Sequence, residues 1–400
     1  MELRARIADE IRRRGPIPFS RYMELCLYHP ELGYYSRARE AFGKHGDFYT
    51  SSDVHALFGR LLARQFDEMW RALGAPSRIG LVELGPGRGL FAQDVLDWSH
   101  KKFPDFLDAL HYVLVERSAR LRLRLQERFA ERKDKVTILG SLEEWANPSG
   151  NTIVFANEFF DALPVEVIAS DGALAIGIEG TRLVECWVAP STEALEFLDR
   201  YGVHPQALHR SGDPADRSSR FAGSGQAQDG SAIFSGERVE ATLAAVDYVR
   251  QLAAKVPRGF IVAVDYGYTR EELLAGRAAN TVRAFRHHTL SPTVYDAPGE
   301  QDITASVNFS ALRTTAVEAG MEAGDLVTQA EFLIGIGEAN QFGDAFEDTL
   351  LPQERAKVTL QLKHLVTPAG LGEIFQVLVL RRGVEREKAL KLAGLRYARR

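Results

Sequence analysis

The stretch Glu83-Leu84-Gly85-Pro86-Gly87-Arg88-Gly89 decides the fold of this chain. An apolar run at residues 79–82 precedes it, and apolar residues at helical spacing, Phe91, Val95 and Trp98, follow it. This order predicts a strand, a glycine turn and a helix. In such a unit a ligand can approach bare backbone, and the first N–H groups of the helix point at it.

The charges at the ends of two predicted strands indicate which ligand binds. Glu83 stands before the glycines, where a carboxylate would repel a pyrophosphate but attract a cation. A second apolar run, residues 110–115, ends in Glu116, which can accept hydrogen bonds from both hydroxyls of a ribose. The glycines follow G-x-G-x-G, whereas nicotinamide dinucleotide turns follow G-x-G-x-x-G. We therefore predict a site for S-adenosylmethionine (SAM), whose amino group and sulfonium are cationic; the alternative is a tight turn with two solvated glutamates.

Composition and charge exclude several classes of protein. The chain has 400 residues and a net charge of −5, which argues against broad nucleic-acid binding. No apolar run approaches the roughly 20 residues of a membrane span. Cys26 and Cys186 are far apart in sequence, so neither a disulfide framework nor a cysteine metal site is expected. Glu2, Asp9 and Glu10 are acids of a kind that transit peptides avoid. Together with the two isolated cysteines, this predicts a location in the reducing cytoplasm.

Apolar runs alternate with helical patterns along most of the chain, which predicts an α/β fold with a mostly parallel twisted sheet and helices on both faces. The further runs lie at residues 136–139, 152–156, 260–264 and 374–380. We expect an N-terminal arm at 1–54, rich in loops from residue 16 onward. A core at 55–382 follows, interrupted by a polar insertion at 188–236, and the chain ends in a basic helical tail at 383–400.

Catalytic groups are expected beyond the carboxyl ends of the strands, where open parallel sheets bind ligands. Ser141 and Leu142 follow the third run, and Asn157, Glu158 and Asp161 follow the fourth, where the methyl group should point. The two carboxylates of this last group can hold an arginine guanidinium by paired hydrogen bonds. The alternative is that Asp161 caps a helix and Glu158 is structural.

One further polar pair is interpreted as a loop rather than a site. His287 and His288 are adjacent, and adjacent histidines usually point apart. No acid stands at metal-ligand spacing from them, so no metal is expected.

Short stretches spread over most of the chain resemble the MidA-like methyltransferases, whose mitochondrial relatives are complex I assembly factors. These stretches are Pro16-Ile17-Pro18-Phe19, Tyr28-His29-Pro30, Gly33-Tyr34-Tyr35, Gly46-Asp47-Phe48-Tyr49-Thr50, Phe58-Gly59, residues 83–89, residues 157–165, Asp265-Tyr266-Gly267, Arg283-Ala284-Phe285 and residues 299–304. The chain departs from the family pattern at Ser52-Asp53, where Pro-Glu is usual, and at Ser306 and Asn308, where His and Asp are usual.

The resemblance implies a class I SAM-dependent methyltransferase that methylates an arginine of a protein, a core subunit of respiratory complex I. It also implies that the loop at 46–50 closes over the cofactor. The residues predicted to contact the cofactor are Glu83, Gly85, Pro86, Gly87, Gly89, Glu116, Ser141, Leu142, Asp47 and Thr50.

Other functions stay open at this point. A nicotinamide-dependent oxidoreductase would bind NAD and not SAM. A small-molecule methyltransferase would use the aromatic arm as a closed pocket, and a non-catalytic assembly protein would keep the fold without the reaction. We expect a protein acceptor as partner, while the oligomeric form, a homodimer included, stays open.

Overall fold

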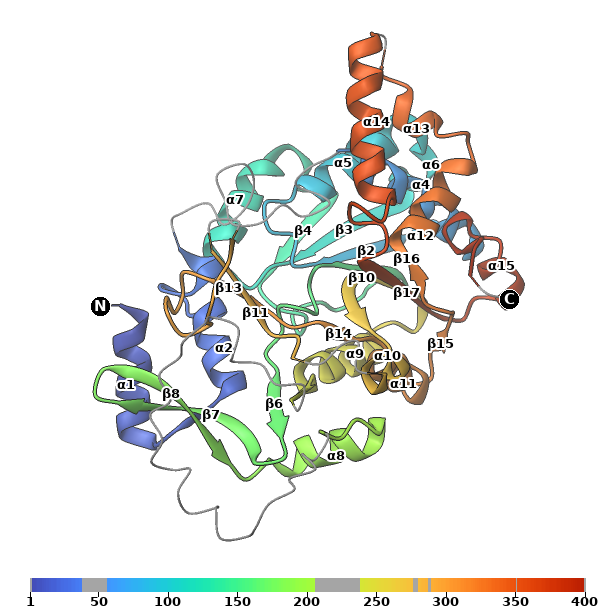
Figure 1. Cartoon of the computed structure of the whole chain (residues 1–400). Helices are drawn as coiled ribbons and strands as arrows, with labels where there is room; N and C mark the ends of the chain where they lie inside the picture. The colour runs from blue at the N-terminus through green and yellow to red at the C-terminus, as the bar shows by residue number, and fades with distance from the viewer. Residues whose placement is uncertain are drawn as a thin grey trace.

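The computed structural model describes residues 2–37, 56–205, 238–275, 280–286, 289–349 and 351–398, and a twisted sheet lies at its centre (Figure 1). β4, β3, β2, β5 and β10 are parallel neighbours in this order, and β17 pairs antiparallel with β10. The strands are β2 (Ile79–Leu84), β3 (Leu110–Val115), β4 (Val136–Leu139), β5 (Asn151–Asn157), β10 (Arg258–Tyr268) and β17 (Phe375–Arg382), with short β14 (Val307–Asn308), β15 (Glu322–Ala323) and β16 (Val327–Thr328) at the margins. The mostly parallel sheet predicted from the apolar runs is confirmed.

Helices cover both faces of this sheet because its strands are apolar on both sides. In β2, Leu81 packs with the helices of one face and Val82 with those of the other. The first face carries α4 (Ala56–Ala72), α5 (Leu90–Lys102), α6 (Pro104–Ala109), α7 (Ala119–Arg128), α12 (Gln329–Glu338), α13 (Gly343–Phe346) and α14 (Pro352–Val366). The second face carries α9 (Leu243–Lys255) and α11 (Phe309–Glu318).

A smaller antiparallel layer lies beside the central sheet (Figure 1). It contains β1 (Ile17–Pro18), β7 (Gly172–Glu179), β6 (Glu166–Ala169) and β9 (Val239–Ala241) in this order, with β8 (Arg182–Val188) paired to β7. The N-terminal arm packs here through α1 (Leu3–Arg14) and α2 (Phe19–Tyr28), whose Ile7 and Phe19 share an apolar cluster with Ile176 of β7. The arm is therefore less loop-rich than its sequence suggested, because residues 19–28 form a helix with a buried apolar face.

A third set of strands and several short elements complete the described chain. The three-stranded sheet consists of β12 (Thr289–Leu290), β11 (Arg283–Arg286) and β13 (Asp302–Thr304). The remaining helices are α8 (Thr192–Tyr201), α10 (Arg270–Leu274), α15 (Arg386–Ala389), η1 (Tyr34–Ser36), η2 (Ala130–Arg132) and η5 (Ala393–Leu395). α8 begins inside the polar segment expected at 188–236, and residues 206–237 lie outside the described residues.

The C-terminal tail differs from the solvated helix expected for residues 383–400. It forms two short helical turns, and Ala389, Leu392 and Leu395 are buried. Leu392 and Leu395 join the apolar cluster that contains α4 and α12. The many basic residues of the tail obscured this packing in the sequence, because the buried apolar side chains of its described part, Val384, Ala389, Leu392 and Leu395, are few.

The order of the strands positions the site. The chain runs outward from β2 to β3 and β4, and then returns to β5 on the other side of β2. At such a reversal the connections after neighbouring strands diverge and leave a crevice at the carboxyl ends. The crevice is therefore expected beyond Leu84 and Asn157.

Candidate active site

A cavity of about 290 Å³ lies at this reversal of strand order. Its volume is close to the lower end of the range of about 300–1,000 Å³ that is typical of ligand pockets. Among the residues predicted from the sequence, those that line it are Glu83, Gly85, Pro86, Gly87, Glu116, Ser141, Leu142, Asn157 and Glu158. The structure thus brings together residues from the ends of β2, β3, β4 and β5, which are far apart in sequence.

Glu83, the second-last residue of β2, is a buried carboxylate on the cavity wall. Its side chain is 5% exposed, and the hydroxyl of Tyr112 donates to Glu83 Oε2 at 2.8 Å. Burial raises the pKa of Glu83 to about 8, the charge of Glu116 adds to this, and the Tyr112 hydrogen bond opposes it. A buried carboxylate without a neighbouring cation is costly to ionise, so this position is suited to a cationic ligand.

Glu116 ties the glycine turn to the end of β3. Its carboxylate accepts hydrogen bonds from the backbone N–H of Gly87 at 3.3 Å and of Ser118 at 2.8 Å. Burial raises the pKa of Glu116 to about 7, and these two hydrogen bonds oppose the shift. Each carboxylate oxygen has a further acceptor position, and a ribose diol offers two donors.

The glycine turn needs its glycines for two different reasons. Gly85, Gly87 and Gly89 all have positive φ, at 63°, 52° and 72°, which L side chains rarely adopt. A Cβ on Gly85 would lie 3.1 Å from the ring of Phe159, which lines the cavity. Gly89 does not line the cavity: it is the N-cap of α5, and a Cβ there would meet Leu125 of α7 at 2.5 Å. Its effect on a ligand would therefore be indirect, through the placement of α5.

The side of the cavity near β4 and β5 is apolar and aromatic. Leu142 is buried, and the rings of Phe159 and Tyr248 meet edge to face with centroids 4.9 Å apart. Tyr248 comes from α9, and the sequence did not indicate it because it does not follow an apolar run. Phe159 does follow one, but it was not assigned to the cofactor site. Such a wall favours a flat aromatic group such as a nucleobase.

The residues after β5 are arranged differently from the predicted pair of carboxylates. Asn157 Nδ2 donates to Glu158 Oε1 at 3.1 Å, and both side chains line the cavity. Asn157 Oδ1 is buried without a hydrogen-bond partner among the described residues, so a donor on a ligand could satisfy it. Asp161 is 4% exposed and is not part of the cavity wall. Of the two carboxylates expected to form a clamp on one turn, Glu158 therefore lies at the wall, whereas the backbone of Asp161 is bonded to Asp265 and Ala305 and its side chain is buried away from the cavity.

The N-terminal arm completes the wall through two tyrosines. Tyr28 and Tyr35 line the cavity, and the hydroxyl of Tyr28 donates to the Ala162 carbonyl at 2.9 Å. The guanidinium of Arg117 lies over the Tyr28 ring, 4.7 Å from its centroid. These aromatic side chains of the arm therefore pack against the loop after β5 and at the same time border the candidate site.

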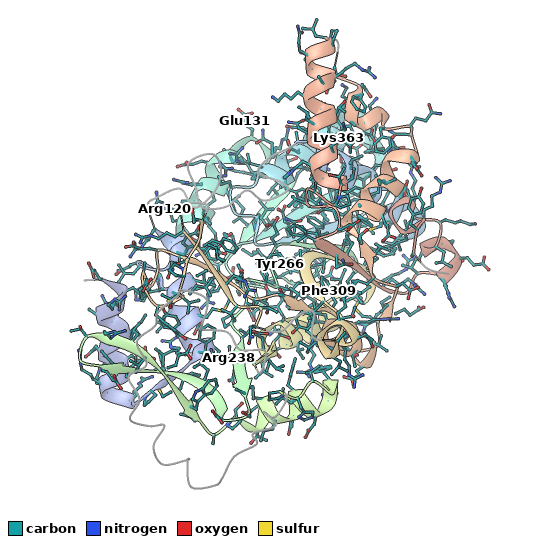
Figure 2. The ribbon with its side chains drawn as sticks, viewed as in Figure 1. Arg120, Glu131, Arg238, Tyr266, Phe309 and Lys363 are labelled. Atoms are coloured by element: carbon teal, nitrogen blue, oxygen red, sulfur yellow. The ribbon has the colours of Figure 1, made fainter. Side chains whose placement is uncertain are left out.

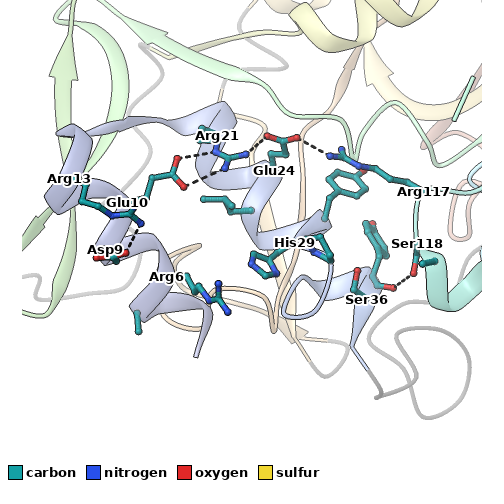
Figure 3. A pocket seen from close by; sticks show the side chains of 16 residues that line it. Arg6, Asp9, Glu10, Arg13, Arg21, Glu24, His29, Ser36, Arg117 and Ser118 are labelled. Carbon is teal, nitrogen blue, oxygen red and sulfur yellow. Dashed lines mark hydrogen bonds and ion pairs between the residues drawn. The ribbon is translucent and has the colours of Figure 1, made fainter. Parts of the chain in front are cut away.

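A second, more open cavity of about 980 Å³ adjoins the first (Figure 3). Tyr28, Tyr35 and Arg117 line both cavities. Charged side chains of α1 and α2 form a row along it, in which Glu24 accepts from Arg21 at 2.8 Å and from Arg117 at 2.9 Å. The second cavity is polar, in contrast to the aromatic wall of the first.

Several residues named in the sequence analysis lie outside the part of the chain that the structure describes. Asp47, Thr50 and the rest of the loop at 46–50, and also His287 and His288, lie outside the described residues. Among the residues that are described, no three His, Cys, Asp or Glu side chains form a group that could hold a metal ion. Within the same ranges no helix combines the length and the apolar character needed to cross a membrane.

Comparisons with known proteins agree with this geometry. A family described as "Putative S-adenosyl-L-methionine-dependent methyltransferase" matches residues 61–327. The protein arginine methyltransferase NDUFAF7 homolog, mitochondrial, of Drosophila melanogaster is 32% identical over 96% of this chain and 84% of its own length. The protein arginine methyltransferase NDUFAF7, mitochondrial, of Homo sapiens is 28% identical over 93% of this chain and 81% of its own.

One solved structure is similar over the whole chain. A protein from Burkholderia thailandensis bound to S-adenosyl-homocysteine has a TM-score of 0.77 and 27% identity, covering 100% of this chain and 95% of its own. This likeness agrees with the class I fold inferred from the resemblance and with a SAM-type cofactor.

The relatives also correct one expectation. They are named as mitochondrial proteins, which contradicts the cytoplasmic location expected from the acids near the N-terminus. Glu2 is the N-cap of α1, and Asp9 and Glu10 lie in this helix, whose Leu3, Ile7 and Ile11 are buried. The acids are therefore accounted for by a packed amphipathic helix and carry no information on location. Family, relatives and cavity agree on the chemistry: the chain belongs to the S-adenosylmethionine-dependent methyltransferases of this family.

Proposed function

We propose that this methyltransferase transfers the methyl group to an arginine of a protein acceptor, and that Glu158 binds the arginine guanidinium. The observation that carries the proposal is the placement of the Glu158 carboxylate on the cavity wall, after β5 and across the reversal of strand order from the glycine turn. The relatives named above as protein arginine methyltransferases support the choice of acceptor. The resemblance to MidA-like proteins favours a subunit of respiratory complex I.

The residues of the cavity fit the cofactor in three places. Glu83 would attract its cationic amino-acid end, Glu116 its ribose hydroxyls, and the wall of Leu142, Phe159 and Tyr248 its adenine. When bound, the cofactor supplies an electrophilic methyl group on a positively charged sulfur. What remains for the protein is to align the acceptor and to exclude water.

Glu158 has two tasks in this proposal. An arginine side chain arrives protonated, so a carboxylate can orient its guanidinium by charge-assisted hydrogen bonds. A bond forms between the guanidinium nitrogen and the methyl carbon while the bond from carbon to sulfur breaks, and the nitrogen then loses a proton. Glu158 is placed to accept that proton or to pass it to water. Asn157, which donates to Glu158 Oε1, keeps one oxygen oriented.

The second cavity offers a path for the acceptor. It adjoins the first at Tyr28, Tyr35 and Arg117, and its volume exceeds what one arginine side chain needs. The ion pairs along it are partly exposed, for example Arg21 with Glu24, so a polar polypeptide segment could exchange partners with them at little cost. We propose that the arm forms the acceptor side of the cleft.

The test uses a substitution at Glu158. Labelled SAM is incubated with the protein and with lysate from a strain that lacks the gene, and the labelled product is analysed by mass spectrometry. We expect a methylated arginine with the unaltered chain and at least a hundredfold less label with Glu158→Gln, while calorimetry shows that SAM still binds. The exposed Glu179→Gln on β7 is the matched control and should keep full activity.

Two outcomes would contradict the proposal. Full labelling by Glu158→Gln would remove Glu158 from the reaction. Label that appears in small molecules and not in protein would instead favour a small-molecule methyltransferase.

A further inference from the structure

Asp265 is a buried carboxylate beside the site that has no place in the reaction described above. It lies near the end of β10 and is 1% exposed. The preceding residue, Val264, pairs with Asn157 of β5, and the N–H of Glu158 donates to the Val264 carbonyl at 2.9 Å. After this bond the chain that follows β5 leaves the sheet, whereas β10 continues to Tyr268 beside β17 and β14. Asp265 is therefore the first residue of β10 that lies beyond the pairing with β5 and beside the loop; Tyr266, which follows it, is labelled near the middle of the view in Figure 2.

The carboxylate of Asp265 accepts hydrogen bonds from that loop. Its Oδ2 accepts from three successive backbone N–H groups, those of Phe159 at 3.2 Å, Phe160 at 3.0 Å and Asp161 at 3.3 Å. Its Oδ1 accepts from the N–H of Tyr266 at 3.0 Å. Successive N–H groups that converge on one point form a concavity that binds an acceptor oxygen, and here that oxygen belongs to a side chain of the same protein. Burial and the charges of Asp161 and Glu158 raise the pKa of Asp265, and the backbone hydrogen bonds oppose this shift.

Glu158 has a backbone conformation that needs such support. Its φ is +50°, in the left-handed region that a residue other than glycine occupies at a cost. A strained conformation persists where the surrounding structure fixes it on both sides. The bond to Val264 fixes Glu158 on its N-terminal side, and the bonds to Asp265 fix the residues that follow it.

We propose that Asp265 is a positioning residue for methyl transfer: by holding the backbone of residues 159–161 it keeps Glu158 in the conformation that presents its carboxylate to the cavity. This inference rests on the proposed role of Glu158. Asp265 does not line the cavity and acts on the site only through the loop that it holds, which carries Glu158 and Phe159. The anchor of Tyr28 on the Ala162 carbonyl lies beyond this segment and does not replace it.

The position of the Glu158 carboxylate can be measured without an acceptor. Sinefungin carries an amino group where SAM carries its methylsulfonium, whereas S-adenosyl-homocysteine carries no charge there. The ratio of their dissociation constants, measured by calorimetry, reports whether a carboxylate faces that point. A charge-assisted hydrogen bond corresponds to a preference for sinefungin on the order of tenfold or more, which we expect for the unaltered protein.

Substitutions at Asp265 should remove this preference in steps. Asp265→Ala removes the acceptor for all three loop N–H groups, and we expect the ratio to fall to about one while S-adenosyl-homocysteine affinity changes less than about threefold. Asp265→Asn keeps one uncharged acceptor oxygen, so an intermediate ratio is expected. Glu158→Gln should abolish the preference directly.

The control is Asp344→Ala. Asp344 of α13 is also 1% exposed and accepts from Trp98 Nε1 at 3.1 Å and from Arg64, but it lines none of the cavities described. This variant should lose thermal stability and keep the full preference, which separates positioning from general destabilisation.

The outcomes distinguish the two proposals. An unaltered ratio in folded Asp265→Ala, or in Asp265→Asn where the alanine variant does not fold, overturns the role of Asp265. An unaltered ratio in Glu158→Gln overturns the role of Glu158 and with it the proposed function, whatever the Asp265 variants do.

Discussion

Glu83 and Glu116, at the ends of neighbouring strands, are two residues whose burial bears directly on the kind of ligand that the cavity can hold. Glu83 and Glu116 are both buried, and burial raises the pKa of each, to about 8 and about 7. Without a cation, the protein at neutral pH holds protons on these groups that ordinary glutamates would have released. A cationic ligand favours the ionised form of Glu83, so binding and deprotonation are coupled.

The first prediction is that SAM affinity rises with pH. Below its pKa of about 8, Glu83 must lose a proton before it can pair with the cation, so the dissociation constant should increase by up to about tenfold per pH unit on lowering the pH. Calorimetry between pH 6 and 9 measures this, and titrations in buffers of different ionisation enthalpy reveal the released proton. Glu83→Gln should bind more weakly at pH 8 and show a flatter profile. A flat profile in the unaltered protein would contradict the coupling.

At the scale of elements, the glycine turn does more than border the ligand site: it also lets α7 pack closely against the start of α5. Gly89 begins α5 with a φ of +72°, and its missing Cβ leaves room for Leu125 and Phe129 at the end of α7. Those two side chains belong to the apolar cluster on the same face of the sheet. The close approach of α7 to the turn therefore depends on a glycine at this position.

The second prediction concerns this contact. In Gly89→Ala the new Cβ meets Leu125 and Phe129, so strain and overpacking together should lower the free energy of unfolding by about 2–4 kcal/mol. Gly74→Ala is the matched control: its φ is +85° but nothing lies within 4 Å of the added Cβ, so a loss of only about 1–2 kcal/mol is expected. Urea denaturation measures both. Equal losses would mean that backbone strain alone acts at Gly89.

Sequence reasoning succeeded where the signal is local and failed where it is not. Glu83 and Glu116 directly follow an apolar run and Glu158 follows one after a single residue, and parallel strands bring such ends to one edge of the sheet. Asp265 also follows an apolar run, but its hydrogen bond with Phe159 joins residues that are 106 positions apart in the sequence. No pattern of apolar residues predicts such a long-range contact. The hydrogen bond from Tyr28 to Ala162 spans 134 residues in the same way.

At the scale of the molecule, the site influences stability because its carboxylates are buried by the fold as a whole. Helices, sheet and arm together exclude water from Glu83, and Tyr112, from the neighbouring strand, is itself fully buried. The unfolded chain offers these carboxylates full hydration. The difference in their pKa between folded and unfolded states therefore makes the free energy of unfolding depend on pH.

The last prediction follows from the sign of this difference. The pKa of Glu83 is about 8 in the folded protein and about 4.5 in the unfolded chain, so between these values the folded state binds more protons. The stability that this group contributes is present below pH 4.5 and is lost as the pH rises towards 8, at roughly 1.4 kcal/mol per pH unit. In ligand-free protein the melting temperature should therefore fall more steeply over this range than in Glu83→Gln, which has no proton to lose. Saturating SAM should stabilise the unaltered protein more at pH 8 than at pH 6, because its cation then pairs with a carboxylate that is otherwise costly to ionise. Differential scanning calorimetry at constant ionic strength checks both trends, and parallel slopes for the two proteins would show that Glu83 is ionised in the fold without any ligand.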